Sequence, residues 1–170
     1  MKDSIFKCPA LIGFLVKKLK EKHRKVGKTI VQKMMYLLTR EKIVDFKYTM
    51  YHYGPYSFEV AGELNFAKDT GIVDIQWDEM DGYYDITPGS KLNDFENLIE
   101  EKEKKAIEKI VEDFGRFNAI EISIIATALF IKDNFKVPNK ELAEKVKKLK
   151  PEHKDEYIKH ILYRAKIITH

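Results

Sequence analysis

The segment YGPYS at residues 53–57 constrains the fold more than any other part of this 170-residue chain. Gly54-Pro55 predicts a turn, because glycine tolerates positive φ and proline fixes its own φ. Ser57 is a favoured N-cap residue, so a helix is expected to begin directly after the turn. Tyr51, Tyr53 and Tyr56 crowd this turn with large rings that each carry one polar end. The block therefore predicts a strand, a turn and a helix in direct succession.

Hydrophobic periodicity predicts the elements around this block. Apolar residues recur at helical spacing over about 9–23 and 28–40. Residues 46–53 are rich in aromatic and β-branched types and predict a strand, whose alternation would turn Tyr51 and Tyr53 towards the core. The helix that begins at Ser57 should end at Gly71, and residues 72–77 and 83–87 should form a β-hairpin. Helix, helix, strand, helix and hairpin is the order of a winged-helix variant.

Residues 88–90, Pro-Gly-Ser, predict a boundary beyond which helical patterns prevail. Residues 92–114 carry one such pattern, and Asn118 and Glu121 predict a capping box before a strongly apolar helix over 122–134. Shorter helices are expected over 141–149 and 152–166. Because the segments are too short for two independent cores, we expect a single domain over 1–170 with an α+β, mainly α fold. Its winged-helix-like lobe, helices plus a small antiparallel β-sheet, would cover 1–88, and a helical lobe would cover 91–170.

Charge is distributed unevenly along the chain. Residues 1–50 contain 13 Lys and Arg against 4 Asp and Glu, whereas residues 51–100 contain 2 against 11. Such asymmetry indicates a charged partner, self-association as a homodimer, or mutual neutralisation of neighbouring elements in one fold. No apolar run approaches the roughly 18 residues of a membrane span. The start of the chain is a poor signal peptide, so a cytoplasmic protein without a membrane partner is expected.

Residue types suited to catalysis or metal binding form no recognisable pattern. Cys8 is the single cysteine, so an intramolecular disulfide is impossible, and we expect a buried apolar residue there. The five histidines lack metal-ligand spacing, and no serine lies in a Gly-x-Ser-x-Gly motif. Residues 26–29, VGKT, imitate the end of a phosphate-binding loop but lack its earlier glycine. We therefore expect no enzyme activity, no cofactor and no metal.

Three segments together resemble a known family. The helix KTIVQKMMYLL at 28–38, the block YHYGPYS at 51–57 and GIV at 71–73 are similar to the SocA-like Panacea antitoxin domain and the related YwgA group. In that family a helix with the pattern K-x-x-K/Q-K-x-x-Y-L precedes Y-x-x-Y/W-G-P-Y/F-S and a hairpin that starts G-x-I/L. Residues 118–130 and 146–151 are also similar to the YwgA group. The resemblance implies a non-enzymatic binding module, in some members an antitoxin that grips a toxin and in one case an adaptor presenting it to a protease.

The surface expected to bind a protein partner combines the second helix with the Gly-Pro turn. Tyr56, at the turn, is the aromatic residue expected to contact the partner. The family resemblance implies that this partner is a toxin or a protease client. The expected surface consists of Lys28, Gln32, Lys33, Tyr36, Gly54, Pro55, Tyr56 and Ser57.

An alternative hypothesis is a nucleic-acid-binding regulator that uses its basic N-terminal helices. Its cations would bind phosphate without sequence preference. In the usual docking of a winged helix, however, the helix after the turn and the wing face the DNA. Here residues 69–90 contain six carboxylates and no lysine or arginine, a surface that repels phosphate, so nucleic acid is disfavoured. The cations of this alternative are Lys17, Lys18, Lys20, Lys22, Arg24 and Lys25.

Overall fold

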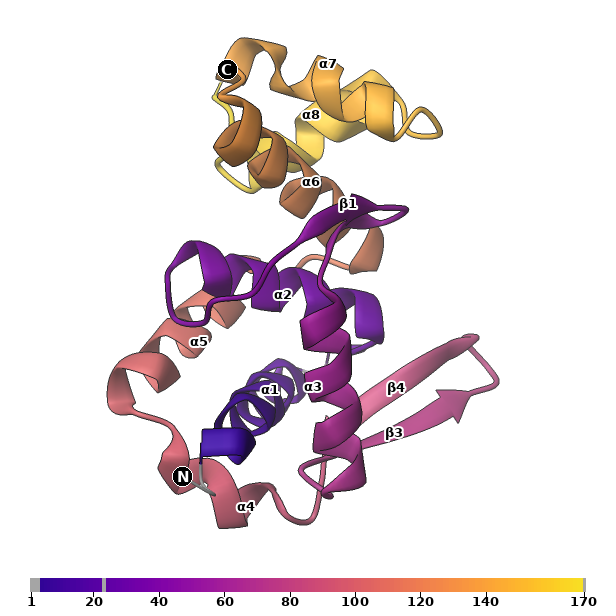
Figure 1. The fold of residues 1–170 in the computed structure, drawn as a ribbon. Coiled ribbons are helices and arrows are strands. Elements are labelled where there is room, and N and C mark those ends of the chain that lie inside the picture. The colour runs from indigo at the N-terminus through magenta and orange to yellow at the C-terminus, as the bar shows by residue number, and fades with distance from the viewer. Residues whose placement is uncertain (1–3, 23, 170) are drawn as a thin grey trace.

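The computed structural model describes residues 4–22 and 24–169, and its fold is α+β, mainly α, as the sequence predicted (Figure 1). The first half contains α1 (Ser4–Glu21), α2 (Lys28–Arg40), β1 (Thr49–Tyr51), β2 (Gly54–Tyr56), α3 (Phe58–Asp69), β3 (Val73–Asp78) and β4 (Tyr83–Pro88). The second half contains α4 (Leu92–Phe95), the 3-10 helix η1 (Glu96–Leu98), α5 (Glu101–Phe114), α6 (Ala119–Phe135), α7 (Asn139–Leu149) and α8 (Asp155–Arg164).

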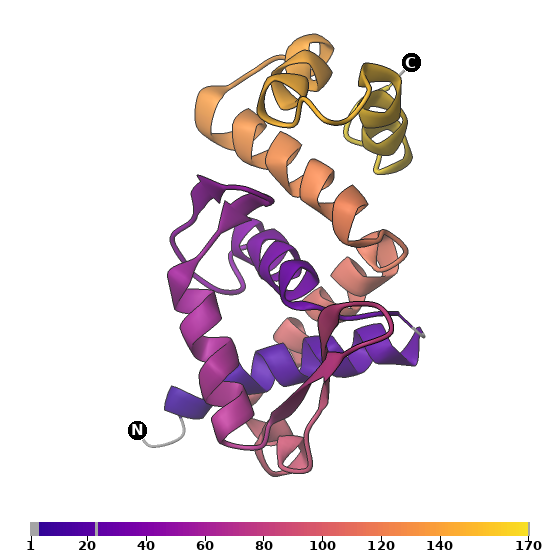
Figure 2. The same ribbon diagram turned by 90° about the vertical axis from the view of Figure 1, so that its right-hand side faces the viewer.

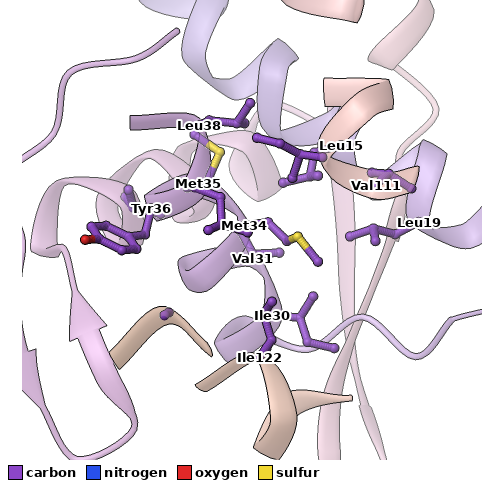
Figure 3. Packing of buried hydrophobic residues seen from close by; sticks show 14 of the residues in the cluster. Leu15, Leu19, Ile30, Val31, Met34, Met35, Tyr36, Leu38, Val111 and Ile122 are labelled. Carbon is purple, nitrogen blue, oxygen red and sulfur yellow. The ribbon is translucent and has the colours of Figure 1, made fainter. Parts of the chain in front are cut away.

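Helix α2 lies at the centre of the hydrophobic core. Its buried side chains include Ile30, Val31 and Met34, and they face side chains from α1, α5 and α6 (Figure 3). Removing each such aliphatic side chain from water contributes about 1.5–3 kcal/mol, so α2 is held from several sides. The neighbouring side chains labelled in the figure are Leu15 and Leu19 of α1, Val111 of α5 and Ile122 of α6.

The predicted helices are present with shifted ends. Helix α1 begins at Ser4, whereas the predicted helix began at about residue 9. Pro9 lies inside the helix and is tolerated there because its missing N–H removes a hydrogen bond only near the start. Residue 23, the last of the predicted first helix, lies outside the described residues. The predicted helix over 92–114 is divided, because Glu100 is in an extended conformation and forms a capping box with Glu103 that starts α5 anew. Asn118 and Glu121 form the predicted capping box at the start of α6.

The prediction for residues 46–55 was wrong in its strand and turn. Strand β1 is limited to Thr49–Tyr51 and pairs with β2, so Gly54 and Pro55 lie in a strand and the turn lies at His52 and Tyr53. Gly54, with a φ of 106°, makes the exit from this turn, a conformation that glycine adopts without strain. The β3–β4 hairpin is present as predicted, with Trp77 opposite Tyr84. It projects from the body of the molecule (Figure 1).

The helices of the second half divide between two parts of the molecule. Helices α4 and α5, together with η1, pack against α1, although the sequence had placed them in a separate lobe over 91–170. Helix α6 contacts α2 and β2, and α7 and α8 pack against α6 at the end of the molecule remote from α1 (Figures 1 and 2). Helix α6 is therefore buried by neighbours from both parts, which explains its continuous apolar sequence.

Among the helices of residues 4–22 and 24–169, none is by itself both long and apolar enough to cross a membrane. Helices α5 and α6 satisfy that test of length and composition only as a pair bent by 111°.

Candidate partner-binding surface

The residues predicted to bind a partner do meet, but several of them hold the β1–β2 hairpin on α2. Gln32 donates from Nε2 to the carbonyl of Ser57 at 2.9 Å and accepts from the Ser57 N–H at 3.0 Å. Lys33 donates from Nζ to the carbonyl of Pro55 at 3.0 Å. We call Gln32, Lys33, Pro55 and Ser57 the latch. All four are buried and hold the hairpin in place, and two of them, Gln32 and Lys33, also line a groove beside it.

Two more of the predicted contact residues are buried. Tyr36 lies edge-on to Tyr48 at a centroid distance of 5.1 Å, and burial raises the pKa of its hydroxyl. Gly54 is buried, and a Cβ at this position would lie 2.6 Å from Oγ1 of Thr127 on α6. Ser57 caps α3 as predicted, accepting from the Val60 N–H at 3.2 Å. Of the eight predicted residues, Lys28 is exposed and Tyr56 is half-buried.

Aromatic side chains that were predicted to face the core are exposed instead. Tyr51 and Tyr53 expose 54% and 66% of their surface. Strand β2 lies against α2 and α6, which leaves β1 and the turn on the outside of a sheet of two strands. Alternation along β1 therefore does not direct Tyr51 inward, because in the described part of the chain β1 has extensive contacts with β2 but with no helix.

Tyr51, Tyr56 and Phe58 form a cluster of rings on this surface, here called the aromatic cluster. The ring centroids of Tyr51 and Tyr56 are 5.5 Å apart, and those of Tyr56 and Phe58 are 5.2 Å apart. Phe58, the first residue of α3, is 70% exposed. These distances are typical of favourable aromatic pairs, so the rings hold one another in place while remaining open to solvent.

The aromatic cluster borders a groove of about 370 Å³, here called the aromatic groove. Helix α3 also lines this groove through Ala61 and Leu64, and α2 lines it through Lys28, Thr29, Gln32 and Lys33. A cavity of this size accepts one or two side chains of a partner, and its walls are mainly apolar.

A larger groove lies on the other side of the start of α2. This wing groove has a volume of about 850 Å³ and runs between the β3–β4 hairpin and the start of α6. Trp77 and Tyr84 pack edge-on at 4.9 Å and are about half exposed, and Lys28 places its ammonium 4.4 Å from the centroid of the Tyr84 ring. Because Lys28 and Thr29 line both grooves, the two grooves meet at the start of α2.

Three further residues of this surface, Phe58, Trp77 and Tyr84, were not predicted from the sequence. Phe58 follows an N-cap, at a position where the first turn of a helix is usually exposed. Trp77 and Tyr84 face each other across the hairpin, and the predicted strand limits already placed them in register. The hairpin register was thus the signal that could have identified this pair.

The basic residues proposed for nucleic-acid binding are largely paired within the chain. Lys17 binds Glu96 at 2.9 Å, Lys20 binds Asp85 at 2.6 Å, and Lys22 binds Glu112 at 2.7 Å. Similar contacts join Lys18 to Glu21 and Glu108 and Lys25 to Asp81, whereas Arg24 is exposed beside the wing groove. The lysines of the basic first segment are therefore neutralised by carboxylates later in the chain. This is the explanation of the charge asymmetry by mutual neutralisation within one fold.

The residue types suited to metal binding and nucleophilic catalysis have the following surroundings. In the part of the chain that the structure describes, no group of three or more His, Cys, Asp or Glu side chains is placed to hold a metal ion. Cys8 is half-buried, and burial, followed by the charge of Glu63, raises the pKa of its thiol. A thiol with a raised pKa is a poor nucleophile at neutral pH.

Searches for similar proteins found no family model and no curated protein sequence that matches this chain.

Proposed function

We propose that this chain is a non-enzymatic protein-interaction module, antitoxin-like or adaptor-like, that binds its partner over the aromatic cluster and the two grooves beside it. The observation that carries the proposal is the group of exposed aromatic side chains around the start of α2: Tyr51, Tyr53, Phe58, Trp77 and Tyr84.

Exposed aromatic residues in a cluster favour protein binding for an energetic reason. Each ring that a partner covers removes a large apolar area from water, and tyrosine and tryptophan are enriched among the residues that dominate interface energies. The latch fixes β2 to α2, so the aromatic cluster lies on a rigid support and loses little entropy on binding.

The charges at the junction of the grooves define the chemistry of the partner. Lys28 lies where the grooves meet, and it forms no ion pair with any carboxylate in the described ranges. A partner segment that inserts apolar side chains into both grooves and places a carboxylate at Lys28 would complement this surface. The resemblance of residues 28–38, 51–57 and 71–73 to the Panacea and YwgA families supports a toxin or a protease client as that partner.

The test is capture of partners from a lysate of the source organism with tagged wild-type protein and two matched variants. Phe58→Ser removes a ring from the aromatic cluster, whereas Phe135→Ser removes an equally exposed ring at the end of α6. We expect Phe58→Ser to lose a stoichiometric protein partner that wild type and Phe135→Ser retain. A typical hot-spot loss of about 2 kcal/mol corresponds to roughly thirtyfold weaker binding.

The same experiment with nuclease separates the alternative function. Retention that disappears after nuclease treatment, with nucleic acid in the untreated eluate, would favour the basic N-terminal helices as the binding surface. A captured protein that stops growth when it is expressed alone, but not together with this chain, would support the antitoxin-like form of the proposal.

A further inference from the structure

The wing groove has the size and the lining of a site for a small organic molecule. Its volume of about 850 Å³ lies within the range of about 300–1,000 Å³ that is typical of ligand pockets. Trp77 and Tyr84 of the β3–β4 hairpin and Ile120 of α6 line it, and each of the three is about half exposed. A molecule in the groove therefore meets accessible apolar side chains from two separate elements.

The charges that line the wing groove are not balanced. Its lining contains three cations, Arg24, Lys25 and Lys28, but one carboxylate, that of Asp81. Lys25 already occupies this carboxylate at 2.5 Å. Within residues 4–22 and 24–169, Arg24 and Lys28 form no ion pair, although most lysines of the basic first segment are paired. Two positive charges at the groove are thus left for an anion from outside the chain.

Lys28 joins the charged part of the wing groove to its aromatic part. Its ammonium lies 4.4 Å from the centroid of the Tyr84 ring, and that ring packs edge-on against Trp77. A cation on the face of a ring keeps N–H groups that can donate to an anion. An anion bound by Lys28 therefore lies close to the two exposed rings. An aromatic ring attached to that anion can pack against them, which is favourable beyond the burial of apolar area.

We propose that the wing groove binds a small aromatic anion. The ring of the ligand packs against Trp77 and Tyr84, and its phosphate or carboxylate group accepts hydrogen bonds from Arg24 and Lys28. A nucleoside monophosphate and an aromatic carboxylate share this chemistry. The inference concerns the isolated chain, so it stands or falls separately from the proposed protein partner.

The test is titration of the purified protein with adenosine monophosphate and, separately, with naphthoate, followed by calorimetry at constant ionic strength. Trp77 is the single tryptophan of the chain, so its emission reports binding in the groove. Adenosine and inorganic phosphate are control ligands, because each carries only one half of the required chemistry. We expect at least one of the two aromatic anions to bind, and both control ligands to bind at least about tenfold more weakly. Binding of one anion and not the other identifies the anionic group.

Two variants test the two halves of the site. Lys28→Gln removes a cation and Tyr84→Ser removes a ring, and both positions are exposed, so neither change should prevent folding. The matched controls are Lys68→Gln in the last turn of α3 and Tyr157→Ser on α8, at two further exposed positions. We expect Lys28→Gln and Tyr84→Ser each to weaken binding at least about fivefold, and the controls to bind like wild type. Equal affinities of all five proteins, or no binding of either anion to wild type, would overturn the proposal.

Discussion

Lys33 is a lysine held where lysines rarely occur. It is 2% exposed, and its ammonium donates to the carbonyl of Pro55. Burial and the charge of Lys150 lower its pKa from 10.5 to about 8. The protonated form is therefore less favourable in the folded state than in the unfolded state, so Lys33 costs stability at neutral pH and this cost is relieved as pH rises.

The sign of this effect leads to a pH-dependence prediction. Between pH 8 and pH 10.5 the unfolded state binds more protons at Lys33 than the folded state, so the free energy of unfolding should rise with pH by up to about 1.4 kcal/mol per unit. Cys8 and the buried Tyr36 have raised pKa values and act in the opposite direction at high pH. The difference between wild type and Lys33→Met removes these contributions. Urea unfolding at several pH values should show the unfolding free energy of wild type, minus that of Lys33→Met, becoming more positive from pH 8 upward, and a difference that does not change with pH would contradict the assignment.

At the level of elements, the latch holds the β1–β2 hairpin on α2. Gln32 pairs with both backbone groups of Ser57, and Ser57 is fully buried. Gln32→Ala leaves the buried Ser57 N–H unpaired, whereas the Ser57 carbonyl still accepts from the Ala61 N–H at 3.1 Å, so it should lower the unfolding free energy by about 1–3 kcal/mol. Gln76→Ala, on the exposed side of β3, is the control and should change it by less than about 0.5 kcal/mol. Equal shifts of the urea midpoint would show that the latch contributes nothing.

Elements with a strong local signal could be predicted from the sequence. The capping box of Asn118 and Glu121, the N-cap Ser57 and the end of α3 at Gly71 follow from rules about single turns. The orientation of Tyr51 could not be predicted. Successive side chains of a strand point to opposite faces, but this rule does not say which face the rest of the protein covers. That choice depends on α2 and α6, which lie against β2, and α6 is distant from β1 along the sequence. For the same reason the exposed aromatic cluster emerged only from the fold.

At the scale of the whole molecule the charge asymmetry is resolved inside the chain. Lys20 of α1 pairs with Asp85 of β4, Lys22 pairs with Glu112 of α5, and Lys25 pairs with Asp81 at the tip of the β3–β4 hairpin. Each of these exposed or half-exposed pairs contributes little to stability, typically 0–1 kcal/mol. Together these pairs weaken the electrostatic field around the molecule, because the fields of opposite charges that lie side by side cancel at a distance. The paired charges therefore attract neither phosphate nor a second copy over long distances.

This arrangement predicts that self-association does not depend on salt. The homodimer hypothesis requires the basic first segment of one copy to meet the acidic hairpin of another, but those side chains already pair within one chain. Raising the ionic strength from about 0.01 M to about 1 M shortens the screening length from about 30 Å to about 3 Å. Sedimentation velocity over this range should give one unchanged molecular mass. A dimer at low salt that dissociates at high salt would mean that the pairs of α1 exchange between copies, and Asp85→Asn would then weaken that dimer.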